Sequence, residues 1–410
     1  MGTPFPPRRR WAKPFAMSIA LPIAHQRRGA CPSLDAPMQT GDGLLARLRI
    51  AGGRLTPAAL DMLAHIAATF GNGAVEITAR GNLQVRGLTA AGVLPFARAV
   101  EGVVVIERGP VVETPPLAGD DPEEIADPRP LAARIAEGAA NLTARLGPKV
   151  TVVVDGNGQI NLSDLKADVR LIATTSDAWA VSAGKHYFGV TRQPAQAALA
   201  VLSLLAEHGA GARATELPHI QLLSALGHLC SDAPPVRQPS TSPMGRFRLT
   251  EGYALGLGLP FGAIPGEDMG DLAALAPQHG VTQFRLAPHH ALLAVGALPS
   301  LLDALGDAFI VSPDDPRRRI SACIGSAGCA SGHFPARALA GRLAPLLDAH
   351  TQLHVSGCSK GCAHPRRAGL TLVGRADGYG LVIDGTAGDT PVAVLRADQI
   401  ESAIGPAAQG

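Results

Sequence analysis

The sequence predicts an α+β protein made of two pseudo-repeated halves, each consisting of a ferredoxin-like half-domain and an α/β domain. Three observations support this prediction. The chain has 410 residues, which is enough for two or three domains with sizeable cores. One order of strands and helices occurs twice along the chain, as internal repeats do. The cysteines, by contrast, are concentrated in the last third. The two halves therefore share an order of elements but differ in the residues that could bind a metal.

The first half begins with a tail and a loop and continues into a ferredoxin-like pattern. Thr56 is suited to cap a helix and Pro57 to occupy its first position, so an amphipathic helix is expected to follow. Alternation and helical spacing of apolar residues place the other elements. We interpret the order as a ferredoxin-like pattern, with elements at residues 44–50, 58–70, 75–86, 87–99 and 102–106.

The strand expected at 75–86 has a polar side chain at every second residue. In an extended strand such side chains project from one face of the sheet. A polar face is usually just solvated. Here, however, it holds two arginines and no acid, so it forms a coherent anion-binding surface. The five residues are Thr78, Arg80, Asn82, Gln84 and Arg86.

The first α/β domain is expected to follow and to end at a linker. Its predicted elements are two helices and a strand, at 131–146, 194–208 and 149–155. Cys230 has no cysteine near it in the sequence, so a structural role is expected for it. The segment 234–242 is rich in Pro and Ser, which indicates a linker between the halves.

The second half repeats this plan. Residues 244–249 correspond to the first strand and residues 283–294 to the polar strand, with Arg285 as a further ligand-binding residue. The other expected elements are helices at 271–279, 297–308 and 336–350, a basic strand at 317–323, and strands at 352–355 and within 370–395. The predicted divisions are 1–40 (tail and loop), 41–110 (ferredoxin-like half 1), 111–233 (α/β domain 1), 234–310 (linker and ferredoxin-like half 2) and 311–410 (α/β domain 2).

Four cysteines of the last third form a C-x5-C pair followed by a C-x3-C pair. Four thiolates in two close pairs suit a soft metal, and iron–sulfur clusters are held by such ligands. Zinc sites usually have tighter pairs. Two disulfides remain an alternative, although nothing else marks the chain as a small secreted scaffold. Nearby glycines permit close approach of the backbone to a cluster. The residues are Cys323, Cys329, Cys358 and Cys362.

This pattern resembles the cluster motif of the nitrite/sulfite reductase superfamily. The resemblance implies an α/β domain of the nitrite/sulfite reductase type in each half. It also implies a 4Fe–4S cluster on the four cysteines, with Cys362 able to bridge to a sirohaem iron. The polar strand, T-x-R-x-N-x-Q-x-R, resembles the superfamily's substrate- and macrocycle-binding strand, in which Arg80 and Arg86 would contact carboxylates.

A second segment, beginning at Pro148, resembles a P-x-K-x-K motif whose lysines bind the small anion in sulfite reductases. Lys149 matches the first lysine and is expected to bind an anion, with a plain surface lysine as the alternative. Thr151 stands where the second lysine belongs. That departure weakens the case for sulfite reduction.

Further segments resemble a branch of the superfamily that works in aerobic cobalamin (vitamin B12) biosynthesis: Arg28–Pro32, Thr40–Gly43 and Ser356–Pro365. Membership implies O₂-dependent hydroxylation of the tetrapyrrole precorrin-3A at C20, with γ-lactone formation. It also implies a 4Fe–4S cluster, a mononuclear non-haem iron and electrons that come ultimately from NAD(P)H. The chain has no G-x-G-x-x-G fingerprint at a helix start, so the electrons are expected through a partner reductase or ferredoxin.

Histidines around the cysteines are candidate ligands for the second iron, although a single histidine is more often structural. They are His289, His290, His333, His354 and His364. Two other functions stay open. One is a sirohaem-dependent sulfite or nitrite reductase. The other is a non-catalytic iron–sulfur electron-transfer or tetrapyrrole-carrier protein.

Bulk properties indicate neither a nucleic-acid nor a membrane partner. The formal net charge is +2, and no apolar stretch has the roughly 20 residues needed to span a bilayer. The first forty residues faintly resemble an export signal but lack a clean cleavage site. We therefore expect a tail, with Met17 as an alternative start, in a cytoplasmic protein. Cys31, in the loop that follows, is as readily a small buried residue as a redox group.

Overall fold

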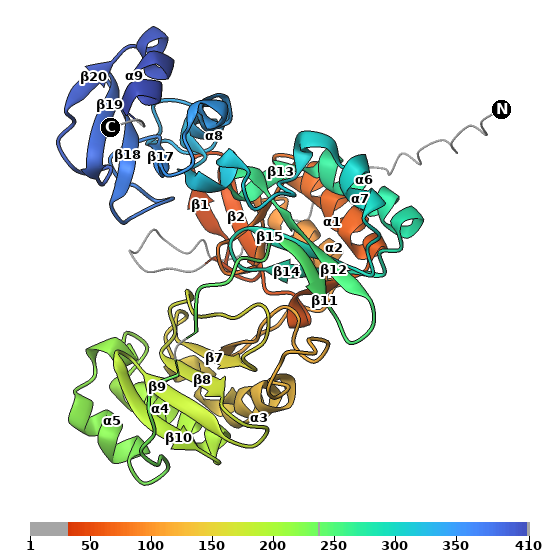
Figure 1. Cartoon of the computed structure of the whole chain (residues 1–410), viewed down its shortest axis with the longest axis vertical. Coiled ribbons are helices and arrows are strands. Elements are labelled where there is room, and N and C mark those ends of the chain that lie inside the picture. The colour runs from red at the N-terminus through yellow and green to blue at the C-terminus, as the bar shows by residue number, and fades with distance from the viewer. Residues whose placement is uncertain (1–31, 237, 408–410) are drawn as a thin grey trace.

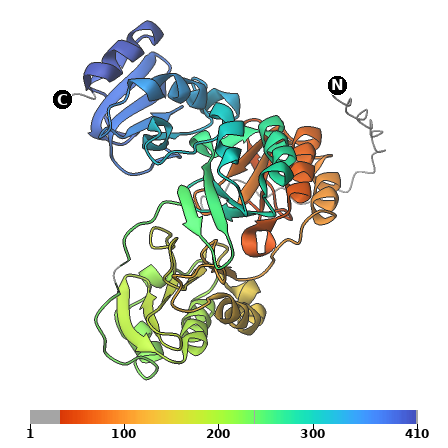
Figure 2. The ribbon, with the colours of Figure 1, turned by 45° about the vertical axis from the view of Figure 1, so that its right-hand side comes forward.

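The computed structural model describes residues 32–236 and 238–407, and its strands form four five-stranded sheets (Figure 1). The two α/β domains lie at opposite ends of the long axis, and the ferredoxin-like halves lie between them (Figures 1 and 2). The α+β class with two repeated halves is confirmed. The tail, Met17 and Cys31 lie outside the described residues. Within the described part of the chain, no helix has the length and apolar character needed to cross a membrane.

The two ferredoxin-like sheets correspond strand by strand. Their orders are β1-β2-β5-β4-β13 and β11-β12-β15-β14-β3. Each sheet takes its last strand from the other half, because β13 pairs with β4 and β3 pairs with β14. This exchange joins the halves into one unit. The strands are β1 Met38–Thr40, β2 Gly43–Leu48, β3 Arg54–Leu55, β4 Ala74–Ile77, β5 Leu83–Leu88, β11 Gly245–Arg248, β12 Tyr253–Gly258, β13 Ala263–Pro265, β14 Gln283–Ala287 and β15 Ala291–Val295.

A single hydrophobic core serves both ferredoxin-like halves. Leu60 of α1 and Leu272 of α6 are fully buried in it. Helix α1 begins as predicted, since the Ala59 amide donates to Oγ1 of Thr56 at 3.1 Å. The helices that cover these sheets are α1 Pro57–Phe70, α2 Val93–Glu101, α6 Gly266–Leu275 and α7 Ser300–Ala304.

The two α/β domains also repeat one another. In each, three parallel strands are followed by two antiparallel ones, in the orders β6-β7-β8-β9-β10 and β16-β17-β18-β19-β20. The strands are β6 Val111–Glu113, β7 Thr151–Asp155, β8 Val169–Ala173, β9 Trp179–Ala183, β10 His186–Thr191, β16 Ile320–Ala322, β17 Leu353–Ser356, β18 Ala368–Arg375, β19 Gly378–Gly385 and β20 Ala393–Leu395. The helices are α3 Arg129–Gly138, α4 Pro194–His208, α5 His219–Leu226, α8 Ala336–Leu343 and α9 Ile400–Ala407.

Four expected strands differ in the structure, and two of them, 75–86 and 283–294, are hairpins of two strands each, β4 with β5 and β14 with β15. Residues 102–106 contribute only an isolated bridge between Ile50 and Ile106. The basic segment expected as a strand at 317–323 starts as a 3-10 turn and becomes β16 only at its end. The cause is local, because the Asp315 carboxylate accepts a hydrogen bond from the Arg317 amide at 2.8 Å and so caps a turn.

Candidate functional site

The four cysteines of the last third line one cavity of about 1050 Å³. Cys323 follows β16 and Cys358 comes just after β17. These strands are parallel neighbours, so both cysteine loops leave the sheet at the same edge. All four thiols are free. Burial raises the pKa of the Cys362 thiol, and the other three cysteines raise it further, as expected for thiols that lie close together.

The two cysteine loops touch through glycine backbone. The Gly357 amide donates to Sγ of Cys323 at 3.1 Å, and the His333 amide donates to the Gly357 carbonyl at 2.9 Å. A methyl group added to Gly357 would lie 2.8 Å from Cα of Gly325 in the first cysteine loop. Only residues without a β-carbon allow this approach.

This donor set fits a 4Fe–4S cluster in number and type, because such a cluster takes four thiolates. Among the described residues, no three His, Cys, Asp or Glu side chains are grouped as a single metal ion would require. Of the five histidines considered as ligands for a second iron, His289, His290 and His364 line the cavity.

The polar residues expected on one strand do not share one strand, and that expectation was wrong. β4 ends before Thr78 and β5 begins after Asn82, so the segment between them is a hairpin turn. Gly81 has φ +79°, and the Asn82 amide donates to Oγ1 of Thr78 at 3.0 Å, as in a tight turn. Polar residues continue to alternate through this turn, so the sequence pattern gave no sign of it. Of the five residues, only Thr78, Gln84 and Arg86 line the cavity.

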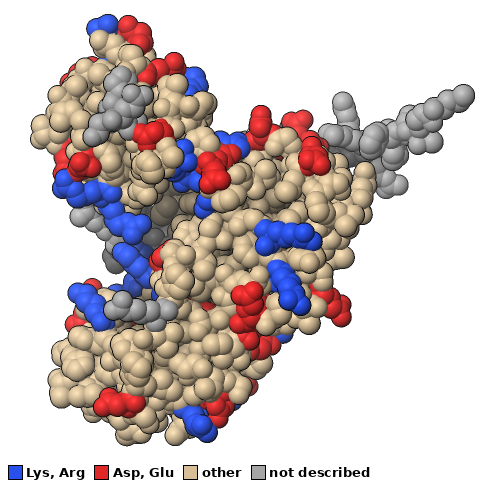
Figure 3. All heavy atoms as spheres, viewed as in Figure 1, with Lys and Arg blue, Asp and Glu red and all other residues tan. Residues whose placement is uncertain are grey.

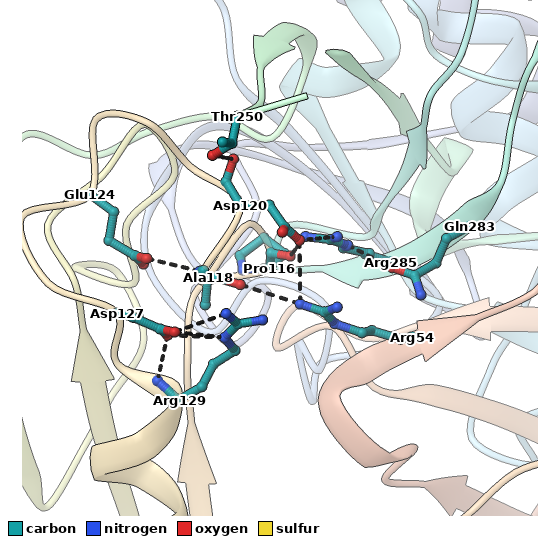
Figure 4. A network of polar contacts seen from close by, with 11 residues as sticks. Arg54, Pro116, Ala118, Asp120, Glu124, Asp127, Arg129, Thr250, Gln283 and Arg285 are labelled. Carbon is teal, nitrogen blue, oxygen red and sulfur yellow. Dashed lines mark hydrogen bonds and ion pairs between the residues drawn. The ribbon is translucent and has the colours of Figure 1, made fainter. Parts of the chain in front are cut away.

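Three basic residues expected at the ligand lie outside the cavity lining. Arg80 forms a bidentate pair with Glu113, with Nε 3.0 Å and Nη2 2.6 Å from its carboxylate oxygens. Arg285 is 4% exposed and pairs with Asp120, on which Arg54 also converges (Figure 4). Lys149 is exposed ahead of β7. The acids that hold the two arginines come from distant segments, and sequence alternation cannot reveal them.

The cavity wall is strongly basic all the same. Among the described residues, seven Lys and Arg side chains line it, against one acid, Glu76. In Figure 3, basic side chains gather at the hollow between the domain of β17–β20 and the domain of β7–β10. Besides Arg86, the basic residues are Arg47, Arg317, Arg318, Arg337, Lys360 and Arg366. The sequence offered a signal for most of them, since they immediately precede Cys323 or accompany the second cysteine pair.

The single acid belongs to a polar row across the first sheet. Arg47, Gln84 and Glu76 are register partners on β2, β5 and β4. Gln84 donates to Glu76 and accepts from Arg47 at 3.4 Å. Arg337 of α8 lies 2.7 Å from the Glu76 carboxylate. Glu76 therefore orients two basic side chains of the wall, and sequence reasoning missed it because three segments build the row.

His290 faces the cavity from a strained turn. Both His289 and His290 have positive φ, +58° and +61°. Nδ1 of His290 lies 2.6 Å from the Ile77 carbonyl, so Nδ1 carries the proton and Nε2 of the neutral ring keeps its lone pair. Burial lowers the pKa of His290. The ring fits because residue 262 is glycine: a methyl group there would lie 2.5 Å from Nδ1.

His354 lies in a different setting, fully buried on β17. Neither ring nitrogen has a hydrogen-bond partner among the described residues. Its ring centroid is 5.7 Å from that of His364. Burial lowers the pKa of His354 to about 4, and the neighbouring His364 lowers it further.

Comparisons with known proteins agree first on the fold. The family model for the nitrite/sulfite reductase ferredoxin-like half domain matches residues 36–103. The solved structure of the Mycobacterium tuberculosis NirA protein aligns with a TM-score of 0.64, covering 88% of this chain and 79% of that one at 20% identity. The chain thus has the fold of the nitrite/sulfite reductases.

Curated relatives narrow the family. A ferredoxin–nitrite reductase of Synechococcus elongatus is 25% identical over 398 residues, which cover 82% of this chain and 77% of the relative. A precorrin-3B synthase of a Sinorhizobium species is 38% identical over 409 residues, covering 93% of this chain and 88% of the relative. The chain therefore belongs to the precorrin-3B synthase family of oxidoreductases.

We predict that His354 limits stability in acid. Its pKa in the folded protein, about 4, lies below the ordinary value of 6.5. The stability from its neutral ring is therefore fully present above pH 6.5 and is lost as the pH falls toward 4. Between these pH values, wild type should lose on the order of 2–3 kcal/mol more unfolding free energy in urea than His354→Met does. His350→Gln, at an exposed position, should follow wild type, and parallel profiles for wild type and His354→Met would refute the prediction.

Proposed function

We propose that this chain converts precorrin-3A to precorrin-3B, by O₂-dependent hydroxylation at C20 and closure of a γ-lactone. The observation that carries the proposal is the 38% identity to a precorrin-3B synthase over 93% of the chain. The cavity of about 1050 Å³ supports it, since this volume is at the upper end of the usual range for ligand pockets, as a tetrapyrrole requires. In such a monooxygenation one oxygen atom of O₂ enters the product, and two electrons and two protons reduce the other to water.

The cysteine set would hold the electron-transfer group. Cys323, Cys329, Cys358 and Cys362 are the proposed ligands of a 4Fe–4S cluster, which when bound supplies one-electron transfer. NAD(P)H is the proposed ultimate donor, through a separate reductase or ferredoxin. The described residues offer no grouped ligands for a single iron, so we assign none to a mononuclear centre and derive no step from it.

Substrate orientation is the proposed task of the basic wall. Precorrin-3A is a flat macrocycle that carries several acetate and propionate groups. Guanidinium and ammonium groups at fixed places would pair with these carboxylates and so determine which meso carbon faces the oxidant. Most wall arginines already have protein partners. Within the part of the chain that the structure describes, Lys360 contacts only the Ser331 hydroxyl, at 2.9 Å, and Arg366 is exposed. These two are therefore the most available for substrate.

His290 is proposed as the proton acceptor of the site. Its Nδ1–H is held by the Ile77 carbonyl, which leaves Nε2 as the basic atom toward the cavity. Within the described residues, Nε2 accepts no hydrogen bond. A proton released from the substrate during the reaction would be held there.

Reduction of a small oxyanion on sirohaem is the second candidate, favoured by the nitrite reductase relative and the shared fold. The residue in place of the second anion-binding lysine argues against it. Thr151 is 4% exposed, and its amide donates to the buried carboxylate of Asp168 at 3.0 Å. A strong Soret band in the purified protein would favour this candidate.

The proposed activity has a direct test. Reconstituted protein is incubated with precorrin-3A, a reductant and ¹⁸O₂, and the molecular mass of the product is measured by mass spectrometry. We expect a product that contains one labelled oxygen atom. Cys358→Ser should abolish product formation, whereas Cys230→Ser, outside the cavity, should retain it. Turnover without label, or nitrite reduction in its place, would contradict the proposal.

The basic wall makes a prediction for substrate affinity. Lys360→Met and Arg366→Met should each raise KM for precorrin-3A by about three- to tenfold with little change in kcat, because a charged contact at an exposed position is lost. Lys185→Met, at an exposed turn of the other α/β domain, is the matched control. Unchanged KM in both variants would show that these residues do not bind the substrate.

His290 should affect kcat rather than binding. We expect His290→Gln to lower kcat by about 10²-fold or more, the usual size of a general-base contribution, with KM nearly constant. Because burial lowers the pKa of His290 below 6.5, the acid limb of kcat in wild type should lie below pH 6.5 and should vanish in the variant. His279→Gln, far from the cavity, is the control. An acid limb that persists in His290→Gln would disprove this assignment.

A further inference from the structure

The loop between β1 and β2 packs backbone to backbone on the first cysteine loop. A methyl group added to Gly41 would lie 2.2 Å from the amide nitrogen of Ala330 and 2.7 Å from Cα of Cys329. No side chain could be accommodated at that separation. Although almost 290 residues separate them in sequence, this loop and Cys329 are thus in direct contact.

Asp42, next to Gly41, is the centre of a fully satisfied polar cluster. Its carboxylate accepts hydrogen bonds from Oγ1 of Thr40 at 2.7 Å, from Nδ2 of Asn72 at 3.1 Å, and from Arg86 at 3.2 and 3.0 Å. The side chains of Asp42 and Arg86 are each only 11% exposed. Burial raises the pKa of Asp42, but the hydrogen bonds from Arg86 and Thr40 outweigh it and leave the pKa below 3.8, so the carboxylate is charged at neutral pH.

Arg86 connects the Asp42 cluster to the first cysteine loop. Its Nη2 also donates to the carbonyl of Gly328 at 2.8 Å, and Gly328 directly precedes Cys329. A methyl group on Gly328 would lie 2.8 Å from Oδ2 of Asp42, so this position too is closed to side chains. The guanidinium thus joins the Asp42 carboxylate and the cysteine loop by three hydrogen bonds.

We propose that Asp42 and Arg86 are positioning residues for Cys329, forming a clasp that holds the first cysteine loop in place for cluster binding. The inference rests on the proposed cysteine-held cluster. It assigns Arg86 to the cofactor loop rather than to a substrate carboxylate. It also explains the Thr40–Gly43 segment: the glycine at 41 permits contact with Cys329, and the acid at 42 captures Arg86.

The clasp predicts that Cys329 becomes more reactive when either partner is changed. In iron-free full-length protein, Asp42→Asn and Arg86→Gln should each raise the rate of Cys329 alkylation by iodoacetamide about tenfold, the usual effect of losing a buried charge-assisted hydrogen bond. Cys230 alkylation should stay constant, which shows that the variants are folded. Arg86→Lys, which keeps the charge, should give an intermediate rate.

The reconstituted cluster provides a second measurement. In Asp42→Asn and Arg86→Gln, the visible absorbance of the cluster should decay several-fold faster after a chelator is added than it does in wild type. The matched control is the Asp35–Arg108 pair, which has the same bidentate geometry, at 3.0 and 2.9 Å, but is more than half exposed. Arg108→Gln should behave as wild type in both measurements.

The outcomes separate this inference from the proposed function. If Asp42→Asn and Arg86→Gln match Arg108→Gln in alkylation and in cluster lifetime, the clasp is refuted while the activity of wild type stands. If wild type takes up no iron and sulfide, the proposed cluster fails. Slower Cys329 alkylation in wild type than in the two variants would still show that the pair positions the loop.

Discussion

The structure depends above all on the contact between two glycine-bearing cysteine loops at one edge of the C-terminal sheet. Parallel pairing of β16 with β17 brings the loops to the same edge, and backbone contact among Gly325, Gly332 and Gly357 lets them meet. Larger residues would separate the loops and with them the two pairs of thiols. The amide of Gly357 also donates to Sγ of Cys323, which is a further contact between the two loops.

The corresponding two loops of the first half, after β6 and β7, contain carboxylates in place of cysteines. These carboxylates accept hydrogen bonds within the loops. After β6 and β7, the Asp121 carboxylate accepts from the Gln159 amide at 2.7 Å and from its side chain at 2.8 Å. A methyl group on Gly158 would lie 2.3 Å from that carboxylate. Nearby, Glu124 accepts from the Gly119 amide at 2.8 Å (Figure 4), and burial raises the pKa of Glu124 to about 7. One repeat therefore carries the candidate chemistry, whereas hydrogen bonds fill the matching loops of its counterpart.

Ion pairs fasten each α/β domain to the ferredoxin-like sheet of the opposite half. Asp120 of the first α/β domain pairs with Arg285 of β14, and Arg337 of the second pairs with Glu76 of β4. Removing one partner of such a buried pair leaves an uncompensated charge, which is strongly unfavourable. Arg285, which the sequence suggests as a ligand-binding residue, is thus paired in domain attachment. Most basic residues of the cavity wall belong instead to the cysteine domain.

The sequence by itself determined the α+β class, the internal repeat, the four cysteines and the family, because spacing and periodicity are local properties that survive in one dimension. It did not determine which charges face the cavity. Arg86 and Gly328 meet across 242 residues and Arg285 and Asp120 across 165, so only the tertiary structure shows that these arginines are already paired. Only the tertiary structure also shows that a turn interrupts the polar strand and that His290 has a fixed tautomer. Both features depend on contacts between the β4–β5 hairpin and the β14–β15 hairpin.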